Sequence, residues 1–443
     1  MHDLRIEYIA PAKLTPNPNN PRTHSKKQLK QLTASFEKFG FTNPILIDGE
    51  NKVLAGHGRL EAAKLAGLVS VPCVRLDHMT PAEARAYIIA DNKLALNSGW
   101  DQELLAEELK FILAEDSSFD LELTGFSFSE VDQLIIESEP KDSGDPADDA
   151  LPELSDTSPR CKVGDLWTLG GHRLICGNSL DPLTVHRLMN GEKARLGFND
   201  FPYNVAIGGN VGGLGAIQHR EFAMASGEMS SAQFTRFLTI AMENISASSL
   251  DGSIHFVCMD WRHMQEVLQA GNAVFSELKN LLVWVKDNGG MGTFYRSRHE
   301  LVFAFKKGTA PHINNFELGQ HGRYRTNVWE YRGSNTFGAG RMEELALHPT
   351  VKPVAMIADA IRDCSKRGET VLDAFGGLGS TLIAAENTGR CARLIEYDAL
   401  YCDTIVRRWE TYTGKRATLV VTSETFEDLR DVRLGIDLGS EAA

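Results

Sequence analysis

Apolar residues in the first 136 positions recur at two spacings, in short runs typical of strands and in longer repeats typical of helices. Ser25 stands where it can cap a helix that ends before Gly40, with Leu29, Leu32 and Phe36 on one face. The pattern therefore predicts a small α/β domain over 1–136 with a helical extension. We expect strands at 44–48, 53–55 and 71–76, and helices at 25–38, 56–64, 81–96, 102–113 and 127–137.

Beyond position 160, apolar strands alternate with helical segments, which predicts an α/β domain around a mostly parallel sheet. We expect strands at 195–198, 254–258, 281–285, 301–305, 371–372 and 393–395. Residues 137–159 carry eight acids and one lysine among prolines and small residues, which predicts an acidic flexible linker. The second domain is then expected over 160–423, followed by an acidic tail over 424–443.

Length and cysteine content favour a multidomain cytoplasmic protein. The chain has 443 residues, too many for one hydrophobic core, and its seven cysteines form no Cys-x-x-Cys pair. We therefore expect reduced thiols in a cytoplasmic protein and no metal site. No apolar stretch is long enough to cross a bilayer, and residues 1–7 lack the apolar core of a secretory signal.

A glycine-rich turn near the C-terminus predicts a nucleoside site. Residues 371–390 read as a strand ending at Asp373, a turn with Gly376, Gly377 and Gly379, and a helix. Glycines let the backbone turn tightly and approach a ligand. Glu396 follows the next strand, 19 positions after Gly377, which is the spacing at which a carboxylate meets a ribose in a nucleotide-binding unit.

A second motif, Asp200-Phe-Pro-Tyr203, directly follows the strand at 195–198. The Asp200 carboxylate and the next carbonyl can both accept hydrogen bonds from an exocyclic amine, while an aromatic ring can stack on a base. Four such residues alone also occur in ordinary turns.

Together the two motifs resemble the amino-methylating DNA methyltransferases of the β group, in which the catalytic motif precedes the cofactor motif. Residues 164–177 resemble the opening segment of that group, and His348-Pro-Thr-Val-Lys-Pro353 is similar to an element that encloses the cofactor. The resemblance implies a Rossmann-like domain that binds S-adenosyl-L-methionine. The matching cofactor residues are Asn178, His348, Thr350, Lys352, Asp373, Phe375, Gly377, Gly379 and Glu396.

The resemblance also implies the reaction. Asp200, Phe201, Pro202 and Tyr203 match the catalytic tetrapeptide, and the amine of a flipped base would be methylated directly. Aspartate at the first position favours adenine N6 as a family tendency. Two alternatives stay open: the same chemistry on cytosine N4 or on RNA, and a ParB-like DNA-binding regulator whose methyltransferase half is weakened or inactive.

Three positions depart from the family pattern. Phe201 replaces the first proline of the tetrapeptide and would add a ring to the base pocket, Asn178 stands where aspartate is usual, and Ala374 replaces a proline of the cofactor loop. Each change could tune or weaken the enzyme.

The target-recognition region of this family lies between the two motifs. Here 279–332 holds nine Lys or Arg against four acids, although the whole chain has a net charge of −13. Arginine can clamp phosphate or read guanine, so double-stranded DNA is the expected partner. The candidate contacts are Arg296, Arg298, Arg323, Arg325 and Arg332.

The N-terminal half resembles the ParB/sulfiredoxin-like domain that is fused to phage and bacterial methyltransferases. The resemblance rests on Asn19-Asn-Pro-Arg22, Gly56-His-Gly-Arg-Leu-Glu-Ala-Ala-Lys64 and Ala90-Asp-Asn-Lys93. Gly56, His57, Gly58 and Arg59 open a helix and are a candidate nucleotide or phosphate loop. A homodimer is a further expectation.

Overall fold

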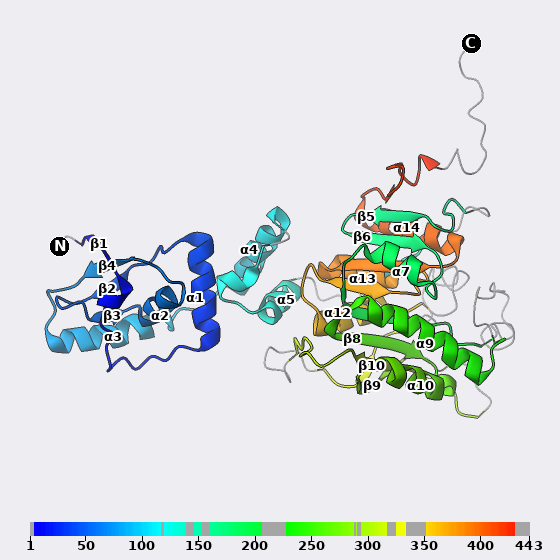
Figure 1. Ribbon diagram of the computed structural model, residues 1–443, viewed down its shortest axis with the longest axis horizontal. Coiled ribbons are helices and arrows are strands. Elements are labelled where there is room, and N and C mark those ends of the chain that lie inside the picture. The colour runs from blue at the N-terminus through cyan, green and yellow to red at the C-terminus, as the bar shows by residue number, and fades with distance from the viewer. Residues whose placement is uncertain are drawn as a thin grey trace, which may run out of the picture. The chain divides into compact units, whose positions relative to one another are not determined.

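The computed structural model describes residues 4–116, 119–138, 146–152, 159–205, 227–287, 289, 294–316, 325–333 and 351–429. The chain forms two compact units, Met1–Pro140 and Lys141–Ala443, whose elements are labelled in Figure 1. The predicted residues His348, Thr350 and Arg323 lie outside the described part. Among the described residues, no helix is long and apolar enough to span a membrane.

The first unit contains a four-stranded sheet in the order β1-β4-β2-β3. Its strands are β1 (Ile6–Ile9), β2 (Ile45–Ile47), β3 (Val53–Ala55) and β4 (Val71–Arg75). Only β1 was not predicted. Its exposure pattern shows why: alternate residues are exposed and none is fully buried, so the apolar signal is weak.

The helices of this unit follow their predicted caps. They are α1 (Lys26–Phe39), α2 (His57–Leu65), α3 (Pro81–Ala95), α4 (Gln102–Glu115) and α5 (Phe128–Glu137). Ser25 accepts a hydrogen bond from the Gln28 amide at the start of α1, as the sequence predicted. α4 and α5 pack on each other around a separate small core that contains Leu109, Leu121 and Val131.

The second unit is built on a ten-stranded sheet in the order β11-β9-β10-β8-β7-β12-β13-β6-β5-β14. The strands β8, β7, β12, β13 and β6 run parallel to one another, as expected of a Rossmann-like domain. The bounds are β5 (Leu166–Leu169), β6 (His172–Cys176), β7 (Ala194–Asp200), β8 (Ser249–Met259), β9 (Glu277–Val285), β10 (His299–Lys306), β11 (Val328–Glu330), β12 (Thr370–Asp373), β13 (Cys391–Glu396) and β14 (Thr418–Leu419).

Helices cover both faces of this sheet (Figure 1). Because side chains alternate along a strand, Phe256 and Cys258 of β8 face one hydrophobic core, and Val257 and Met259 face the other. The first core is closed by α12 (Val354–Cys364), α13 (Ser380–Thr388) and α14 (Ala399–Thr413). The second is closed by α7 (Pro182–Met189), α9 (Ser231–Ala247) and α10 (Met264–Val274). The α/β fold class is confirmed.

The sequence predicted neither of the short edge strands β11 and β14, and two further features differ from its picture. The hairpin β5–β6 extends the sheet beside β13, where the sequence predicted no strand. Within the segment predicted to be a flexible linker, α6 (Pro146–Asp149) is ordered against the second unit, and Asp149 accepts a hydrogen bond from the Val354 amide at 3.0 Å. The linker prediction fails for these residues because their acids bind polar groups of the domain, which composition alone does not reveal.

Candidate functional site

The glycine-rich turn joins β12 to α13 and has the predicted geometry. Gly377 and Gly379 have φ values of +53° and +80°, a region that side chains with a Cβ rarely adopt. A Cβ on Gly379 would also lie 3.2 Å from Ile405 of α14, so this glycine lets the turn approach α14 closely. The Gly377 amide donates to the Glu396 carboxylate at 2.8 Å, which links the turn to the end of β13.

Two carboxylates border this turn, the buried Asp373 and the half-buried Glu396. Burial raises the pKa of Asp373 to about 7, although a hydrogen bond from the Phe375 amide opposes the shift. Burial likewise raises the pKa of Glu396 to about 7, against hydrogen bonds from the amides of Asp398 and Gly377. Hydrogen bonds donated by a ligand would lower both pKa values, so both carboxyl groups would lose a proton near neutral pH when such a ligand binds.

The predicted catalytic acid lies at the end of β7, beside the turn. Asp200 Oδ2 accepts from Lys352 Nζ at 2.6 Å, and Asp200 Oδ1 accepts from the Tyr203 hydroxyl at 3.0 Å. The Tyr203 hydroxyl also lies 2.8 Å from Glu300 Oε2 on β10, and Lys352 Nζ lies 3.1 Å from the same oxygen. Lys286, just after β9, pairs with Glu300 as well. These five residues form one polar cluster.

The cluster holds two carboxylates, of Asp200 and Glu300, and two ammonium groups, of Lys286 and Lys352. Burial raises the pKa of Asp200 more than the neighbouring Lys352 ammonium lowers it. Burial acts in the same direction on Glu300, but Lys352 and Lys286 outweigh it and bring its pKa down to about 2. Burial would lower the pKa of Lys352, yet Asp200 and Glu300 raise it above its usual range. Lys352 is thus held as an ammonium next to the predicted catalytic carboxylate.

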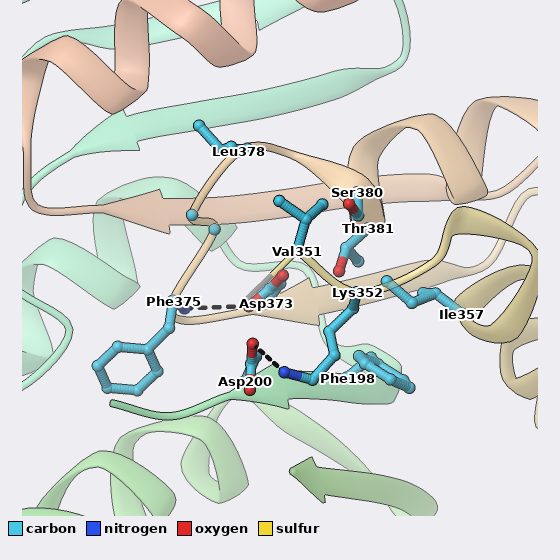
Figure 2. A pocket seen from close by; sticks show the side chains of 12 residues that line it. Phe198, Asp200, Val351, Lys352, Ile357, Asp373, Phe375, Leu378, Ser380 and Thr381 are labelled. Carbon is cyan, nitrogen blue, oxygen red and sulfur yellow. Dashed lines mark hydrogen bonds and ion pairs between the residues drawn. The ribbon is translucent and has the colours of Figure 1, made fainter. Parts of the chain in front are cut away.

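A pocket joins the glycine turn to this cluster, as Figure 2 shows. Asp200 and Lys352 stand at one side, and Asp373 with the loop that contains Phe375 stands opposite. A nucleoside cofactor held by the turn would therefore lie next to the acid of the catalytic motif. The pocket is lined by Phe198, Asp200, Val351, Lys352, Ile357, Asp373, Phe375, Gly376, Gly377, Leu378, Ser380 and Thr381.

The three departures from the family pattern have structural explanations. The Phe201 side chain is 1% exposed, and its ring packs on Phe375 at 4.7 Å, so it fills the core rather than the base pocket, contrary to the prediction. The Ala374 amide donates to Asn199 Oδ1 at 2.8 Å, a bond that a proline could not make. Asn178 Oδ1 accepts from the Leu180 amide at 2.9 Å, a turn contact that aspartate would also make.

The predicted DNA-contacting arginines fall into two groups. Arg296, Arg298 and Arg332 are exposed. Arg325 instead pairs with Asp363 at 2.9 Å and with Asp359 at 3.2 Å, both on α12. These two carboxylates hold the Arg325 guanidinium against α12. Arg325 is therefore not available to contact DNA, and its predicted role is corrected.

The candidate loop of the N-terminal unit begins α2 as expected. Gly56 is the N-cap, and its φ of +97° suits glycine. The side chain of His57 is buried and its Nε2 accepts from the Asn17 amide at 3.2 Å. Burial lowers the pKa of His57, so this histidine is neutral and serves the fold, while Gly58 and Arg59 remain candidates for ligand contact.

Sequence reasoning missed two members of the polar cluster, Lys286 and Glu300. A signal existed, because Glu300 is a charged residue at the second position of a strand whose next five residues are buried. An acid in such a place requires a partner. The Lys286 amide bonds to the Arg298 carbonyl at 2.9 Å, so the end of β9 and the start of β10 bring both side chains to the pocket.

A Rossmann-like sheet with a glycine turn, a strand-end acid for a ribose and a polar cluster beside the pocket defines a class of group-transfer domains with a nucleoside cofactor. Comparison with known families is more specific. Residues 194–407 match the DNA methylase family of the N6/N4 type. Residues 1–92 match the ParB N-terminal domain, and residues 103–163 match the ParB-methyltransferase HTH domain.

Several known proteins and one solved structure are similar to parts of the chain. YnaK of Escherichia coli (strain K12), a ParB-like nuclease domain-containing protein, is 44% identical over 77 residues, which are 17% of this chain and 88% of YnaK. The type II methyltransferase M2.DpnII of Streptococcus pneumoniae is 27% identical over 230 residues, 48% of this chain and 80% of that protein. The crystal structure of the M1.HpyAVI-SAM complex has a TM-score of 0.40 and 16% identity, covering 53% of this chain and 97% of that chain.

Residues 194–407 thus form a DNA methylase domain of the N6/N4 type, and residues 1–92 form an N-terminal ParB domain. The match to a DNA methylase family supports S-adenosyl-L-methionine as the cofactor, as the resemblance implied. The match over residues 103–163 further identifies α4 and α5 as part of a helix-turn-helix domain, which the sequence had presented only as a helical extension.

Proposed function

We propose that this protein methylates the exocyclic amine of a base flipped out of double-stranded DNA, with adenine N6 as the target. The observation that carries the proposal is the shared pocket, in which the glycine turn and Asp200 line the same space. An acceptor is thereby placed beside the cofactor, where a methyl group must meet an amine. The preference for adenine rests on aspartate at position 200, a tendency of the family.

The proposed mechanism is direct transfer. S-adenosyl-L-methionine supplies an electrophilic methyl group when bound. Asp200 and the Phe201 carbonyl would accept hydrogen bonds from the base amine, which favours its more nucleophilic pyramidal form and orients it. A carboxylate has about four acceptor positions, so Asp200 can hold the amine while Lys352 stays in place. Tyr203, fixed through its hydroxyl, would stack on the flipped base.

The cofactor site is proposed to use both sides of the glycine turn. Glu396 would accept the ribose hydroxyls, the amides of the turn and Phe375 would contact the remaining cofactor, and Asp373 and Asn178 would support them from the ends of β12 and β6. Lys352 lines the pocket but contacts Asp200, so its role is better described as holding the catalytic acid. His348 and Thr350 keep the cofactor role that the family resemblance gives them.

We predict that S-adenosyl-L-methionine binds more tightly at pH 8 than at pH 6. Glu396 must be ionised to accept hydroxyl protons, and its pKa in the free protein is raised to about 7. Below that pH the protonated form dominates, so affinity falls as pH falls, by about tenfold between pH 8 and pH 6 for one such group. Calorimetry in buffers of different ionisation enthalpy should detect proton release near pH 7. Glu396→Gln should bind weakly with a flatter pH profile, and a profile as steep as that of the unsubstituted chain would contradict the assignment.

DNA is proposed to contact the loop between β9 and β10. This loop carries exposed Arg296 and Arg298 and leads into Glu300 of the catalytic cluster. Beside the arginines, the side chains of Phe294 and Tyr295 are 87% and 82% exposed. Adjacent exposed aromatic rings of this kind are typical of interaction surfaces. Arg332, exposed after β11, is the third proposed contact.

Replacing Arg298 by alanine should weaken binding of a duplex and lower the salt dependence, with the slope of log K against log salt falling by about 1 if one phosphate contact is lost. Fluorescence anisotropy at several salt concentrations measures both. Arg416→Ala is the matched control, because Arg416 is an exposed arginine next to β14 at the far edge of the sheet. Equal losses for the two variants would exclude a specific role of this loop.

The N-terminal unit is proposed to tether the enzyme to DNA, through the ParB domain and the helices α4 and α5. A nucleotide at Gly58 and Arg59, and a homodimer, remain predictions.

The overall proposal is tested by incubating the chain with labelled S-adenosyl-L-methionine and genomic DNA, followed by nucleoside analysis. We expect N6-methyladenine. N4-methylcytosine would correct the target base, and tight cofactor binding without label in DNA would favour the regulator alternative.

A further inference from the structure

Helix α12, which forms one wall of the cofactor pocket, begins without a cap of its own. Its N-cap residue is Pro353, which has no side chain able to accept a hydrogen bond. The first amide of the helix, on Val354, donates instead to Asp149 Oδ1 at 3.0 Å, across 205 positions of sequence. A carboxylate at this place also interacts favourably with the positive end of the helix dipole. Asp149 thus fixes the start of the helix directly after Lys352.

The same acidic segment reaches the opposite wall through Arg408 of α14. The Arg408 guanidinium donates to the Asp148 carbonyl at 2.7 Å and to the Leu378 carbonyl at 2.8 Å. Leu378 belongs to the glycine turn and lines the pocket. The Tyr412 hydroxyl, one turn further along α14, donates to Asp148 Oδ1 at 2.8 Å. Asp148 is therefore connected to the turn by one side chain.

These contacts lie in well-packed surroundings. Arg408 is 3% exposed and Val354 is fully buried, whereas Asp148 and Asp149 are half-buried, so their hydrogen bonds are partly shielded from water. Bonds that involve a charged partner are stronger than neutral ones, and more so where water is excluded. Two neighbouring residues, Asp148 and Asp149, hold the two sides of one pocket. Both contacts join residues more than 200 positions apart, so residue spacing within the methyltransferase domain does not predict them.

We propose that Asp148 and Asp149 are positioning residues for cofactor binding. They hold α12 and the glycine turn in the arrangement that binds S-adenosyl-L-methionine, so α6, near the start of the second unit, contributes to the cofactor site. A pocket whose walls are already fixed loses less conformational freedom on binding. The inference rests on the proposed location of the cofactor in this pocket.

The test is calorimetric titration of the full chain with S-adenosyl-L-methionine. Asp149→Ala should weaken binding by about 5- to 10-fold, within the range measured for loss of a helix cap. Asp149→Asn keeps an acceptor oxygen and should lose less. Tyr412→Phe, which removes the hydrogen bond from α14 to the Asp148 carboxylate, should also weaken binding. In methyl transfer, the KM for the cofactor should rise by the same factor, with kcat at saturation nearly unchanged.

Glu243→Ala is the matched control, since Glu243 is an exposed acid on α9 and its removal changes the net charge equally. It should bind like the unsubstituted chain. Unchanged affinity in both Asp149→Ala and Tyr412→Phe would overturn the proposal, even if their melting temperatures fell. A lower kcat with an unchanged KM would overturn it too. Lack of binding by the unsubstituted chain would instead refute the proposed pocket itself.

Discussion

Asp200→Ala should lower methyl transfer by about 100- to 1,000-fold, while S-adenosyl-L-methionine binding stays nearly unchanged, because a preorganised group that orients and polarises the reacting amine typically contributes about 3–4 kcal/mol to the transition state. The cofactor turn does not depend on this side chain, and Glu300 remains as a partner for Lys352 at 3.1 Å. Single-turnover transfer of labelled methyl groups, with calorimetry for binding, measures both effects.

Asp260→Ala provides the comparison for this variant. Asp260 also follows a strand, β8, which lies next to β7, but its carboxylate only caps the short turn at 261–263 and pairs with Arg262. Transfer by Asp260→Ala should stay close to that of the unsubstituted chain. If Asp200→Ala retained a tenth or more of the rate, the catalytic role proposed for Asp200 would be wrong.

Lys352→Met should destabilise the second unit by about 3–5 kcal/mol, because it leaves two buried carboxylates without their shared ammonium. The Lys352 side chain is only 3% exposed, and it contacts both Asp200 and Glu300. For a domain of this size the melting temperature should fall by roughly 10 °C in scanning calorimetry. The loss should be smaller at pH 5 than at pH 8. The pKa of Asp200 is already raised, and without the ammonium it rises further, so ionised Asp200 costs stability as pH increases.

Lys415→Met is the control for burial. Lys415 pairs with Glu386 at 3.1 Å, but its side chain is 59% exposed, and exposed pairs contribute about 0–1 kcal/mol. Its melting temperature should change by only a few degrees. A Lys352→Met protein as stable as Lys415→Met would show that the cluster is not a buried charge network.

Local signals in the sequence predicted most elements because their causes are local. The α1 cap is a contact between Ser25 and an amide three residues away, and the turn after β12 needs glycine because of its own φ angles. The hairpin β5–β6 was not predicted because its apolar residues were not recognised as a strand pattern. Helix α6 was not predicted because its acidic composition is typical of a solvated segment.

The sequence by itself determined the α/β class, the order of the two motifs, the cofactor turn and the acid at position 200. Residue spacing encodes these features within about 20 positions, the length of one strand-turn-helix-strand unit. The sequence also predicted that Arg325 contacts DNA. The ion pairs of Arg325 with Asp359 and Asp363 correct this prediction.

Only the tertiary structure decided how distant residues meet. Lys352 reaches Asp200 across 152 positions, and Asp149 reaches Val354 across 205. The strand order places the ends of β7 and β8 and the start of β10 at one edge of the sheet, which brings Glu300 into the cluster. Helix and strand periodicities describe a few neighbouring residues, whereas such pairs depend on which strands lie side by side and which groups lose water together.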